Sequence, residues 1–475
     1  MLLWLVIAYL LVSIGIGLYG ATKVHSAKDY ITAGRNLPIV FILAMVFATW
    51  FGAETVLGIS ATFLEEGFRG LISDPLGSSI CLILFGLVFA RPLYRMNLIT
   101  LGDFFRIRYN RQTELLLSIC IIVSYLGWVS AQITALGLTF NVLSNDLIST
   151  KEGMLIGAAV VLIYTLFGGM WSVALTTLVQ MVVIVIGLLL VASNAAEQAG
   201  GVASVISKAS AEGKFDFLPR LDLLDMLSWT AALLTMALGS IPQQDVFQRV
   251  NAAKNETIAV WGTVLGGFAY FFFAAVPLFL AYSANMIDPA MVQKFLAADS
   301  QMILPTLILN HMPFFIQVVF FGALISVIMS TASGTLLAPS VTFTENILKG
   351  FSPGMSDKQF LLATRVTVFI FTVIVTFYAI VTDARIHTMV ENAYRITLAG
   401  AFVPLVAGLF WKRASNLGAL LAISFGLGVW IVLEITGVEE PVEPQLLGLV
   451  ASAIGMVLGS LLSPKIPHGQ ERDSP

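Results

Sequence analysis

Long apolar runs alternate with short charged or turn-rich segments along the whole chain. Each run has few charges and is long enough for a helix to cross a bilayer core of ~30 Å. The pattern predicts an all-α, multi-pass membrane protein with about thirteen transmembrane helices. They are expected at 2–21, 38–64, 71–90, 115–144, 154–167, 173–196, 224–248, 258–286, 313–348, 360–382, 388–411, 415–436 and 445–463.

Composition supports this class and excludes a soluble protein. Hydrophobic residues make up 58% of the chain and charged residues only 11%, against about 25% charged residues in soluble domains. The net charge of −3 provides no basic stripe for nucleic acid. The two cysteines, Cys81 and Cys120, lie in apolar runs and are interpreted as packing residues. The expected partners are the lipid bilayer and a small-molecule substrate, with no obligate protein partner.

The distribution of positive charge predicts the orientation. Loops after the odd-numbered runs hold 17 of the 25 Lys and Arg residues, and such loops are usually cytoplasmic. They are Lys23, Lys28, Arg35, Arg91, Arg95, Arg106, Arg108, Arg111, Arg249, Lys254, Lys349, Lys358, Arg365, Lys412, Arg413, Lys465 and Arg472. The opposite loops carry acidic pairs such as Glu65–Glu66 and Glu439–Glu440. We predict an N-terminus outside and a cytoplasmic C-terminus, in the inner membrane of a bacterial cell.

Two runs are interrupted at matching positions. Run 38–64 contains Gly52 and Gly58 beside an intramembrane Glu54, and run 224–248 contains Gly239 and Pro242. Transporters built from inverted repeats place their binding site at such broken helices. Gly and Pro are also frequent in ordinary membrane helices, but polar residues beside both breaks favour a functional interpretation.

The five-run spacing of the breaks predicts an inverted repeat within one transporter domain, 1–475. The first repeat is expected over 38–223 and the inverted repeat over 224–414. An extra helix and cytoplasmic loop, 1–37, precede them, and two extra helices and a tail, 415–475, follow. No loop is long enough for a separate soluble domain.

A cluster of hydroxyl groups lies in run 313–348. Ser330, Thr331, Ser333 and Thr335 occur within six residues. Such side chains often hydrogen-bond only to the preceding turn of their own helix. Hard cations prefer oxygen ligands, so hydroxyls from this run and carbonyls freed at a helix break predict a Na⁺ site.

Several motifs together resemble the sodium/solute symporter family. They are Asp29-Tyr30, Ala33 to Pro38, Tyr164 to Ala174, Phe247 to Arg249 and Met329 to Ala332. The resemblance extends over about residues 25–415 and is strongest to the high-affinity choline transporter branch. Motifs of that branch are similar to Ala48 to Trp50, Pro75 to Gly77, Ile241-Pro242 and Met302 to Pro305. The resemblance implies a LeuT-type fold with a 5+5 inverted repeat.

The same resemblance implies the Na⁺ ligands. They fall on the carbonyls of Ala48, Phe51 and Val327 and the hydroxyls of Ser330 and Thr331. Many members have an acidic residue, associated with a second Na⁺, where this chain has Thr177. One Na⁺ site is therefore expected.

Choline recognition by the branch relies on aromatic side chains, of which Trp50 and Trp128 are retained. Two other aromatic positions are Ser78 and Gln243 here, and an acidic position is Ser333. In exchange, the chain has carboxylates at membrane depth. The predicted substrate residues are Trp50, Glu54, Asp74, Ser78, Trp128, Gln243 and Gln244.

These residues also have structural interpretations. Trp50 and Trp128 can be gate or packing residues, and Glu54 can hydrogen-bond the broken backbone. Asp74 can pair with Arg69 near the outer face. The buried carboxylates favour function, because a charge at the bilayer centre costs at least ~2.5–3.5 kcal/mol.

The predicted function is Na⁺-coupled symport of a small polar organic solute, cationic or amine-bearing, by alternating access. An amino acid, sugar or carboxylate is the alternative substrate. A solute sensor and an ion channel are further alternatives, although the chain has no filter repeat or ring of pore-lining charges. It also has no H-E-x-x-H or G-x-S-x-G motif, so an enzyme is not expected.

Overall fold

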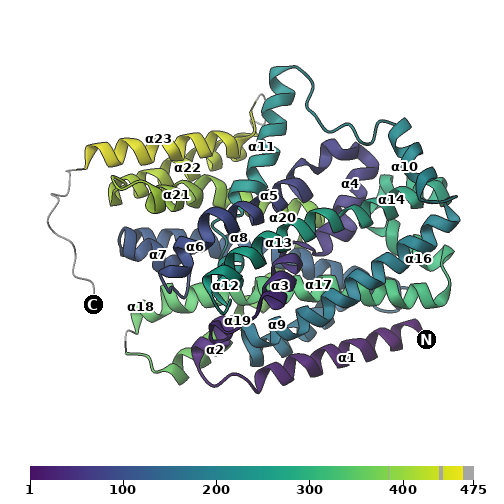
Figure 1. The fold of residues 1–475 in the computed structure, drawn as a ribbon, viewed down its shortest axis with the longest axis horizontal. Coiled ribbons are helices and arrows are strands. Elements are labelled where there is room, and N and C mark those ends of the chain that lie inside the picture. Colours follow the sequence, from purple (N-terminus) through teal and green to yellow (C-terminus); the bar gives the residue numbers. More distant parts are fainter. Residues whose placement is uncertain (353, 383, 438–441, 464–475) are drawn as a thin grey trace.

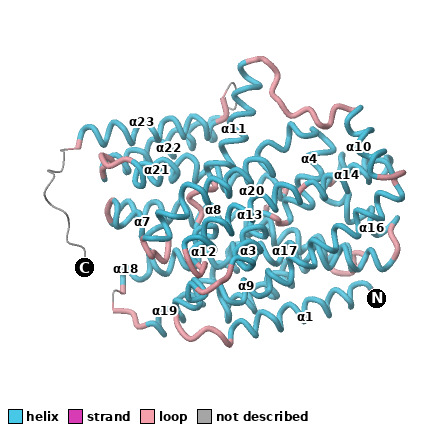
Figure 2. Tube along the Cα trace, viewed as in Figure 1, coloured by secondary structure: helices cyan, strands magenta, loops and turns pink. Residues whose placement is uncertain are grey.

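A computed structural model describes residues 1–352, 354–382, 384–437 and 442–463. Over these residues the chain consists of helices joined by short loops (Figure 2). The only β-type pairing among them is an isolated bridge between Leu37 and Ala253. The all-helical prediction is confirmed. Glu439, Glu440, Lys465 and Arg472, which entered the orientation prediction, lie outside the described residues.

The helices follow the predicted runs closely. The first half contains α1 (Leu2–Ala21), α2 (Ala27–Thr32), α3 (Ile39–Trp50), α4 (Ile59–Glu66), α5 (Ser78–Leu84), α6 (Ala90–Arg95), α7 (Leu101–Arg108), α8 (Arg111–Leu143), α9 (Thr150–Gln198) and α10 (Val202–Ala211). The second half contains α11 (Leu223–Gly239), α12 (Gln244–Asn251), α13 (Glu256–Phe273), α14 (Ala275–Ile287), α15 (Pro289–Ala298), α16 (Ile303–His311), α17 (Phe314–Thr342), α18 (Lys349–Phe351), α19 (Asp357–Val381), α20 (Ile386–Thr397), α21 (Val403–Phe410), α22 (Asn416–Thr436) and α23 (Pro444–Leu462).

Short 3-10 and π-helical segments join many of these helices. They are η1 (Ala33–Arg35), η2 (Glu54–Gly58), η3 (Gly67–Leu71), η4 (Ile72–Gly77), η5 (Phe85–Phe89), η6 (Ser300–Met302), η7 (Phe343–Leu348) and η8 (Leu398–Phe402). Two of them, η2 and η4, carry the buried carboxylates Glu54 and Asp74.

Ten helical stretches of the described chain are long and apolar enough to cross a membrane, or eleven if the bent pair α11 and α12 counts as one span. Two of the ten each cover parts of two predicted runs. The 49 residues of α9 and the 42 residues of Glu54–Arg95 have contour lengths of roughly 74 and 63 Å at ~1.5 Å per residue, about twice the bilayer core. The count of thirteen and the sides of the two termini stay predictions.

The long helix α9 bends at Gly169, between two of the predicted runs. Gly169 has φ 49° and ψ −136°, a conformation that L side chains rarely adopt. A Cβ at this position would lie 2.3 Å from the carbonyl oxygen of Tyr30. Glycine therefore allows both the bend and the close approach of α2.

The helix α17 forms the centre of the bundle. All its residues from Ala323 to Thr342 are buried, and it packs against α9, α8 and α3. The ribbon shows α1 along one edge and the paired helices α22 and α23 along the opposite edge (Figure 1). The broken helices and the hydroxyl cluster of α17 thus lie at the centre, between these edges.

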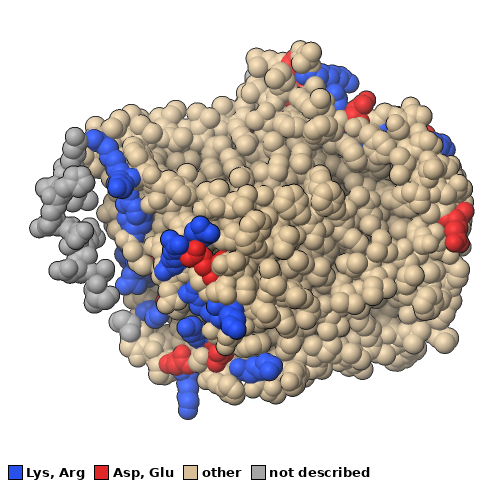
Figure 3. Space-filling view, in the orientation of Figure 1, with Lys and Arg blue, Asp and Glu red and all other residues tan. Residues whose placement is uncertain are grey.

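Charged side chains are segregated on the surface. On the face drawn in Figure 3, most Lys and Arg gather toward the end of the bundle that contains α7 and α18, and the middle is largely uncharged. This segregation agrees with the charge pattern on which the predicted orientation rests.

One arginine that was assigned to a loop lies in the interior. Arg249 on α12 is only 1% exposed, and its Nη1 donates to the Met45 carbonyl oxygen at 2.7 Å and to Thr49 Oγ1. Its placement in a loop is wrong because α12 continues beyond the apolar run and packs its polar residues against α3. Arg249 therefore joins the two broken helices and does not contribute to the loop charge.

Candidate functional site

The first helix break exposes backbone carbonyls in the centre of the bundle. The helix α3 ends at Trp50 and helical structure resumes at η2. The Trp50 carbonyl oxygen accepts hydrogen bonds from Gly52 N and from Thr55 Oγ1, both at 2.8 Å. Such partners are needed because backbone groups freed in a membrane interior have no water to bind.

Thr331, one of the five predicted Na⁺ ligands, faces two of the others where α17 crosses this break. Thr331 Oγ1 donates to the Ala48 carbonyl oxygen at 3.0 Å and lies 3.4 Å from that of Phe51. One turn of α17 supplies the rest, since Ser330 Oγ donates to the Val327 carbonyl oxygen at 2.9 Å. The five residues are buried, and the donor set consists of oxygen atoms without formal charge, which fits a monovalent hard cation.

The position that carries a carboxylate in many relatives is polar but uncharged here. Thr177 on α9 is 1% exposed, and its hydroxyl has no hydrogen-bond partner. One turn later, the buried amide of Gln180 also has no partner for either of its polar atoms. These groups offer no negative charge to a second Na⁺.

Three aromatic rings lie beside the break. The ring centroids of Trp50 and Trp128 are 5.2 Å apart, and Tyr394 lies 5.1 Å from the first and 5.5 Å from the second. Tyr125 also stacks on Trp128, with ring centroids 5.9 Å apart. We call Trp50, Trp128 and Tyr394 the aromatic box. In this box the Trp50 Nε1 and the Tyr394 hydroxyl have no hydrogen-bond partner.

Glu54 lies at the edge of the aromatic box. Its Oε1 accepts from Trp128 Nε1 at 3.3 Å and its Oε2 accepts from Gln132 Nε2 at 2.7 Å. Gln132 also accepts the backbone N–H of Ala53 at 3.1 Å, which holds the break against α8. Glu54 is 1% exposed, and both of its side-chain partners are neutral.

Asp74 forms a second buried carboxylate group nearby. Its Oδ1 accepts from Ser78 Oγ at 2.5 Å and from the Tyr270 hydroxyl at 2.6 Å. The alternative pair with Arg69 is absent, because the Arg69 guanidinium donates to the Leu218 carbonyl oxygen. The Ser78 hydroxyl is therefore a direct hydrogen-bond donor to Asp74.

The second helix break, between α11 and α12, bends the chain by 43°. Gln243 lies in this break and its Nε2 donates to Ser124 Oγ at 3.1 Å, one turn of α8 before Trp128. Thr397 Oγ1 donates to the freed Gly239 carbonyl oxygen at 2.6 Å. Gln243 is therefore close to the aromatic box.

Gln244 is the one predicted substrate residue whose side chain binds the backbone before α7. Its Oε1 accepts the backbone N–H of Leu101 at 2.9 Å, and its Nε2 donates to the Ile99 carbonyl oxygen at 3.4 Å. It fastens α12 to the loop before α7, so we leave it out of the proposed substrate site.

Sequence reasoning missed four residues of this arrangement. Tyr125 and Gln132 are each one turn from Trp128 on α8, so the helical period was a signal for both. Tyr270 and Tyr394 come from distant helices, α13 and α20, and no local pattern distinguishes them from other buried tyrosines.

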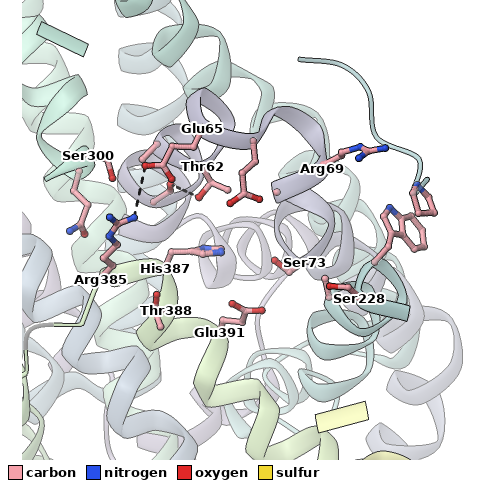
Figure 4. Close-up of a pocket in the computed structure, with 18 of the residues that line it drawn as sticks. Thr62, Glu65, Arg69, Ser73, Ser228, Ser300, Arg385, His387, Thr388 and Glu391 are labelled. Atoms are coloured by element: carbon pink, nitrogen blue, oxygen red, sulfur yellow. Dashed lines mark hydrogen bonds and ion pairs between the residues drawn. The ribbon is translucent and has the colours of Figure 1, made fainter. Parts of the chain in front are cut away.

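A cavity of about 590 Å³ lies next to these groups, and we call it the vestibule. Figure 4 shows His387 and Glu391 of α20 across from Ser73, with Arg385 and Glu65 near the rim. Ser73 directly precedes Asp74, so the lining of the vestibule comes within one residue of this buried carboxylate.

Comparison with known proteins identifies this architecture. A family model described as the sodium:solute symporter family matches residues 30–426, most of the chain. The chain belongs to this family. The symporter is 27% identical to human high affinity choline transporter 1 over 453 residues, which cover 92% of this chain and 77% of the relative. It is 26% identical to the osmoregulated proline transporter OpuE of Bacillus subtilis, with 94% of this chain and 92% of the relative covered.

A solved structure shares the fold. A Na⁺-coupled sialic acid symporter in a substrate-bound outward-open state matches with a TM-score of 0.81 at 18% identity, over 98% of both chains. The family resemblance and the LeuT-type fold inferred from the sequence are confirmed. The protein is a multi-pass, Na⁺-coupled solute symporter and not an enzyme.

Proposed function

We propose that this symporter imports a small organic solute with a positively charged amine, together with one Na⁺, by alternating access. The observation that supports this proposal best is the Glu54 carboxylate at the edge of the aromatic box. An ammonium group that displaces the contact between Glu54 and Trp128 would touch a negative charge and the faces of aromatic rings at the same time.

The energetics favour a cation over an anion. Glu54 is buried with neutral partners only, and an uncompensated charge at membrane depth costs at least ~2.5–3.5 kcal/mol. A bound ammonium removes that cost. Each aromatic face adds roughly 0.5–2 kcal/mol of cation–π attraction. An anionic solute would instead be repelled by Glu54.

The unpartnered donors of the aromatic box indicate a second feature of the solute. Trp50 Nε1 and the Tyr394 hydroxyl are buried without acceptors, and a buried unsatisfied donor costs about 1–3 kcal/mol. A solute with an oxygen beside its amine satisfies them. An amino alcohol such as choline is the first candidate, and an amino acid is the second because its carboxylate would also accept these hydrogen bonds.

The proposed Na⁺ ligands are Ala48, Phe51, Val327, Ser330 and Thr331. Na⁺ at this position joins α3 to α17 and would stabilise the state in which the vestibule is open. The cation site is built on the break that also carries Trp50 and Glu54, so the ion and the solute favour the same arrangement. A membrane potential supplies ~2.3 kcal/mol per charge per 100 mV, which drives accumulation of the solute with one Na⁺.

We place the vestibule on the outer side, following the proposed orientation with the N-terminus outside and the C-terminus in the cytoplasm of a bacterial cell. The proposed repeats, 38–223 and 224–414, would move relative to each other around the central site. This movement would open the site to each side in turn.

Uptake into proteoliposomes tests the proposal. Labelled choline, proline, glucose and sialic acid are compared with and without an inward Na⁺ gradient. We expect Na⁺-stimulated uptake of an amine-bearing solute. Preference for glucose or sialic acid would refute the amine proposal, and Na⁺-independent flux with a steady conductance would indicate a channel.

A further inference from the structure

Asp74 begins a line of hydrogen-bonding groups that ends at the first helix break. Tyr270 lies 2.6 Å from Asp74 Oδ1, Thr55 Oγ1 lies 3.2 Å from the Tyr270 hydroxyl, and Thr55 lies 2.8 Å from the Trp50 carbonyl oxygen. The four groups come from η4, α13, η2 and α3. All four residues are buried, so bulk water does not complete these contacts.

A count of protons along this line shows that one is lacking if Asp74 is ionised. The three contacts need three protons, and the hydroxyls of Tyr270 and Thr55 supply only two. The Trp50 carbonyl can only accept, so Thr55 donates to it. Tyr270 then donates either to Asp74 or to Thr55. A protonated Asp74 donates to Tyr270, which donates to Thr55, and all three contacts become hydrogen bonds.

The charges around Asp74 also favour its protonated form. Asp74 is 2% exposed, and no Lys, Arg or His of the described chain lies within ion-pair distance of its carboxyl group. A second buried carboxylate, that of Glu54, interacts with it electrostatically. Two adjacent buried carboxylates without a cation do not both stay ionised, because each disfavours the charge of the other.

The lining of the vestibule adjoins Asp74 in the chain. Ser73 lines the vestibule and adjoins Asp74, and His387 lines it from α20 and interacts with Asp74 electrostatically. Glu54 of η2, Tyr270 of α13 and Tyr394 of α20 also interact with Asp74 electrostatically. The other charged residues that line the vestibule are Glu65 and Glu66 of α4, Arg69 of η3, Asp225 of α11, Arg385 directly before α20 and Glu391 of α20.

We propose that Asp74 is a proton-binding site of the transport cycle, separate from the Na⁺ site and loaded from the vestibule. The carboxyl group of Asp74 gives its proton to vestibule water and becomes a carboxylate, and the reverse step reloads it. With the proton bound, Glu54 and Asp74 together carry one negative charge. When the proton leaves, the pair carries two negative charges and attracts a cationic solute more strongly.

Infrared spectroscopy of the reconstituted protein tests this site without any substrate. A protonated carboxyl group has a C=O band that is distinct from the carboxylate bands and shifts in D₂O. The wild-type protein is expected to lose such a band as the pH is raised. The difference between wild type and Asp74→Asn should contain this band, whereas Glu54→Gln should retain it.

A second variant distinguishes loss of the proton-binding group from misfolding of the Asp74→Asn protein. Tyr270→Phe keeps the Asp74 carboxyl group but removes its 2.6 Å partner, so the same band should move to higher frequency. The proposal is overturned if the wild type has no titrating carboxyl band, if Asp74→Asn retains it unchanged, or if Tyr270→Phe leaves its frequency unmoved.

Uptake measurements then connect the site to transport, and this part rests on the proposed function. A cationic solute and the proton compete for the two carboxylates, so the KM should fall several-fold as the outside pH rises. In Asp74→Asn the KM should match the wild-type value at acidic pH and stay constant. If the infrared result is as expected but the wild-type KM rises with pH, the solute is not cationic. The assignment of Asp74 as a proton-binding site would then remain supported.

Discussion

The sharpest test of the Na⁺ site is removal of the Thr331 hydroxyl. Thr331 Oγ1 faces the carbonyl oxygens of both Ala48 and Phe51 at the α3 break, at 3.0 and 3.4 Å. Thr331→Ala deletes one of five proposed oxygen ligands. A polar contact to a charged group is worth roughly 1.5–3 kcal/mol, so we expect Na⁺ affinity to fall roughly 10- to 150-fold.

Thermal unfolding in detergent measures this effect without a known substrate. A ligand that binds only the folded state stabilises it by RT ln(1 + [L]/Kd), so the melting temperature rises with the logarithm of the Na⁺ concentration once that concentration exceeds Kd. The Na⁺ concentration that half-occupies the folded protein, called the Na⁺ midpoint, is obtained by fitting this rise for wild type, Thr331→Ala and Thr331→Ser, with choline chloride avoided as the balancing salt. The serine variant retains a hydroxyl group and should keep most of the affinity.

A matched control lies about three turns further along α17. Thr342 is also fully buried, and its hydroxyl donates only to the Ala338 carbonyl oxygen of its own helix. Thr342→Ala should leave the Na⁺ midpoint unchanged. Equal midpoints in Thr331→Ala and wild type, or an equal loss in both alanine variants, would refute the assignment of Thr331 as a Na⁺ ligand.

Three further predictions concern charge. Glu54→Gln should weaken binding of an amine solute by roughly tenfold or more, because it removes a charge-assisted contact. The Na⁺ midpoint should barely move. A preferred solute that is anionic or neutral would contradict this prediction. Reversal-potential measurements should give one Na⁺ per solute, since Thr177 offers no carboxylate; a ratio of two would show that another group binds Na⁺. Burial and the neighbouring carboxylate of Glu345 raise the pKa of Asp103, on α7, from 3.8 to about 6. The folded protein therefore holds this proton more tightly than the unfolded chain, and stability should fall as pH rises from about 4 to 6. In melting curves, Asp103→Asn should flatten this fall, and an unchanged slope would contradict the prediction.

Local pattern was sufficient for the helices and the breaks, whereas the five proposed Na⁺ ligands came from the family resemblance. The length and apolarity of the runs predicted the helices because a bilayer requires both. Gly52 and Pro242 marked the breaks because each disfavours continuous helix. The hydroxyls of Ser330 and Thr331 were recognisable because they lie close together in sequence, on one turn of α17.

The aromatic box and the partners of the buried carboxylates depended on tertiary structure. Tyr394 reaches Trp50 from α20, and Tyr270 reaches Asp74 from α13, in each case across more than a hundred residues of sequence. Hydropathy cannot identify such partners, because apolar residues cover both the lipid-facing and the protein-facing sides of membrane helices. Arg249 illustrates the same point, since only the packing of α12 against α3 moves it from a loop into the interior.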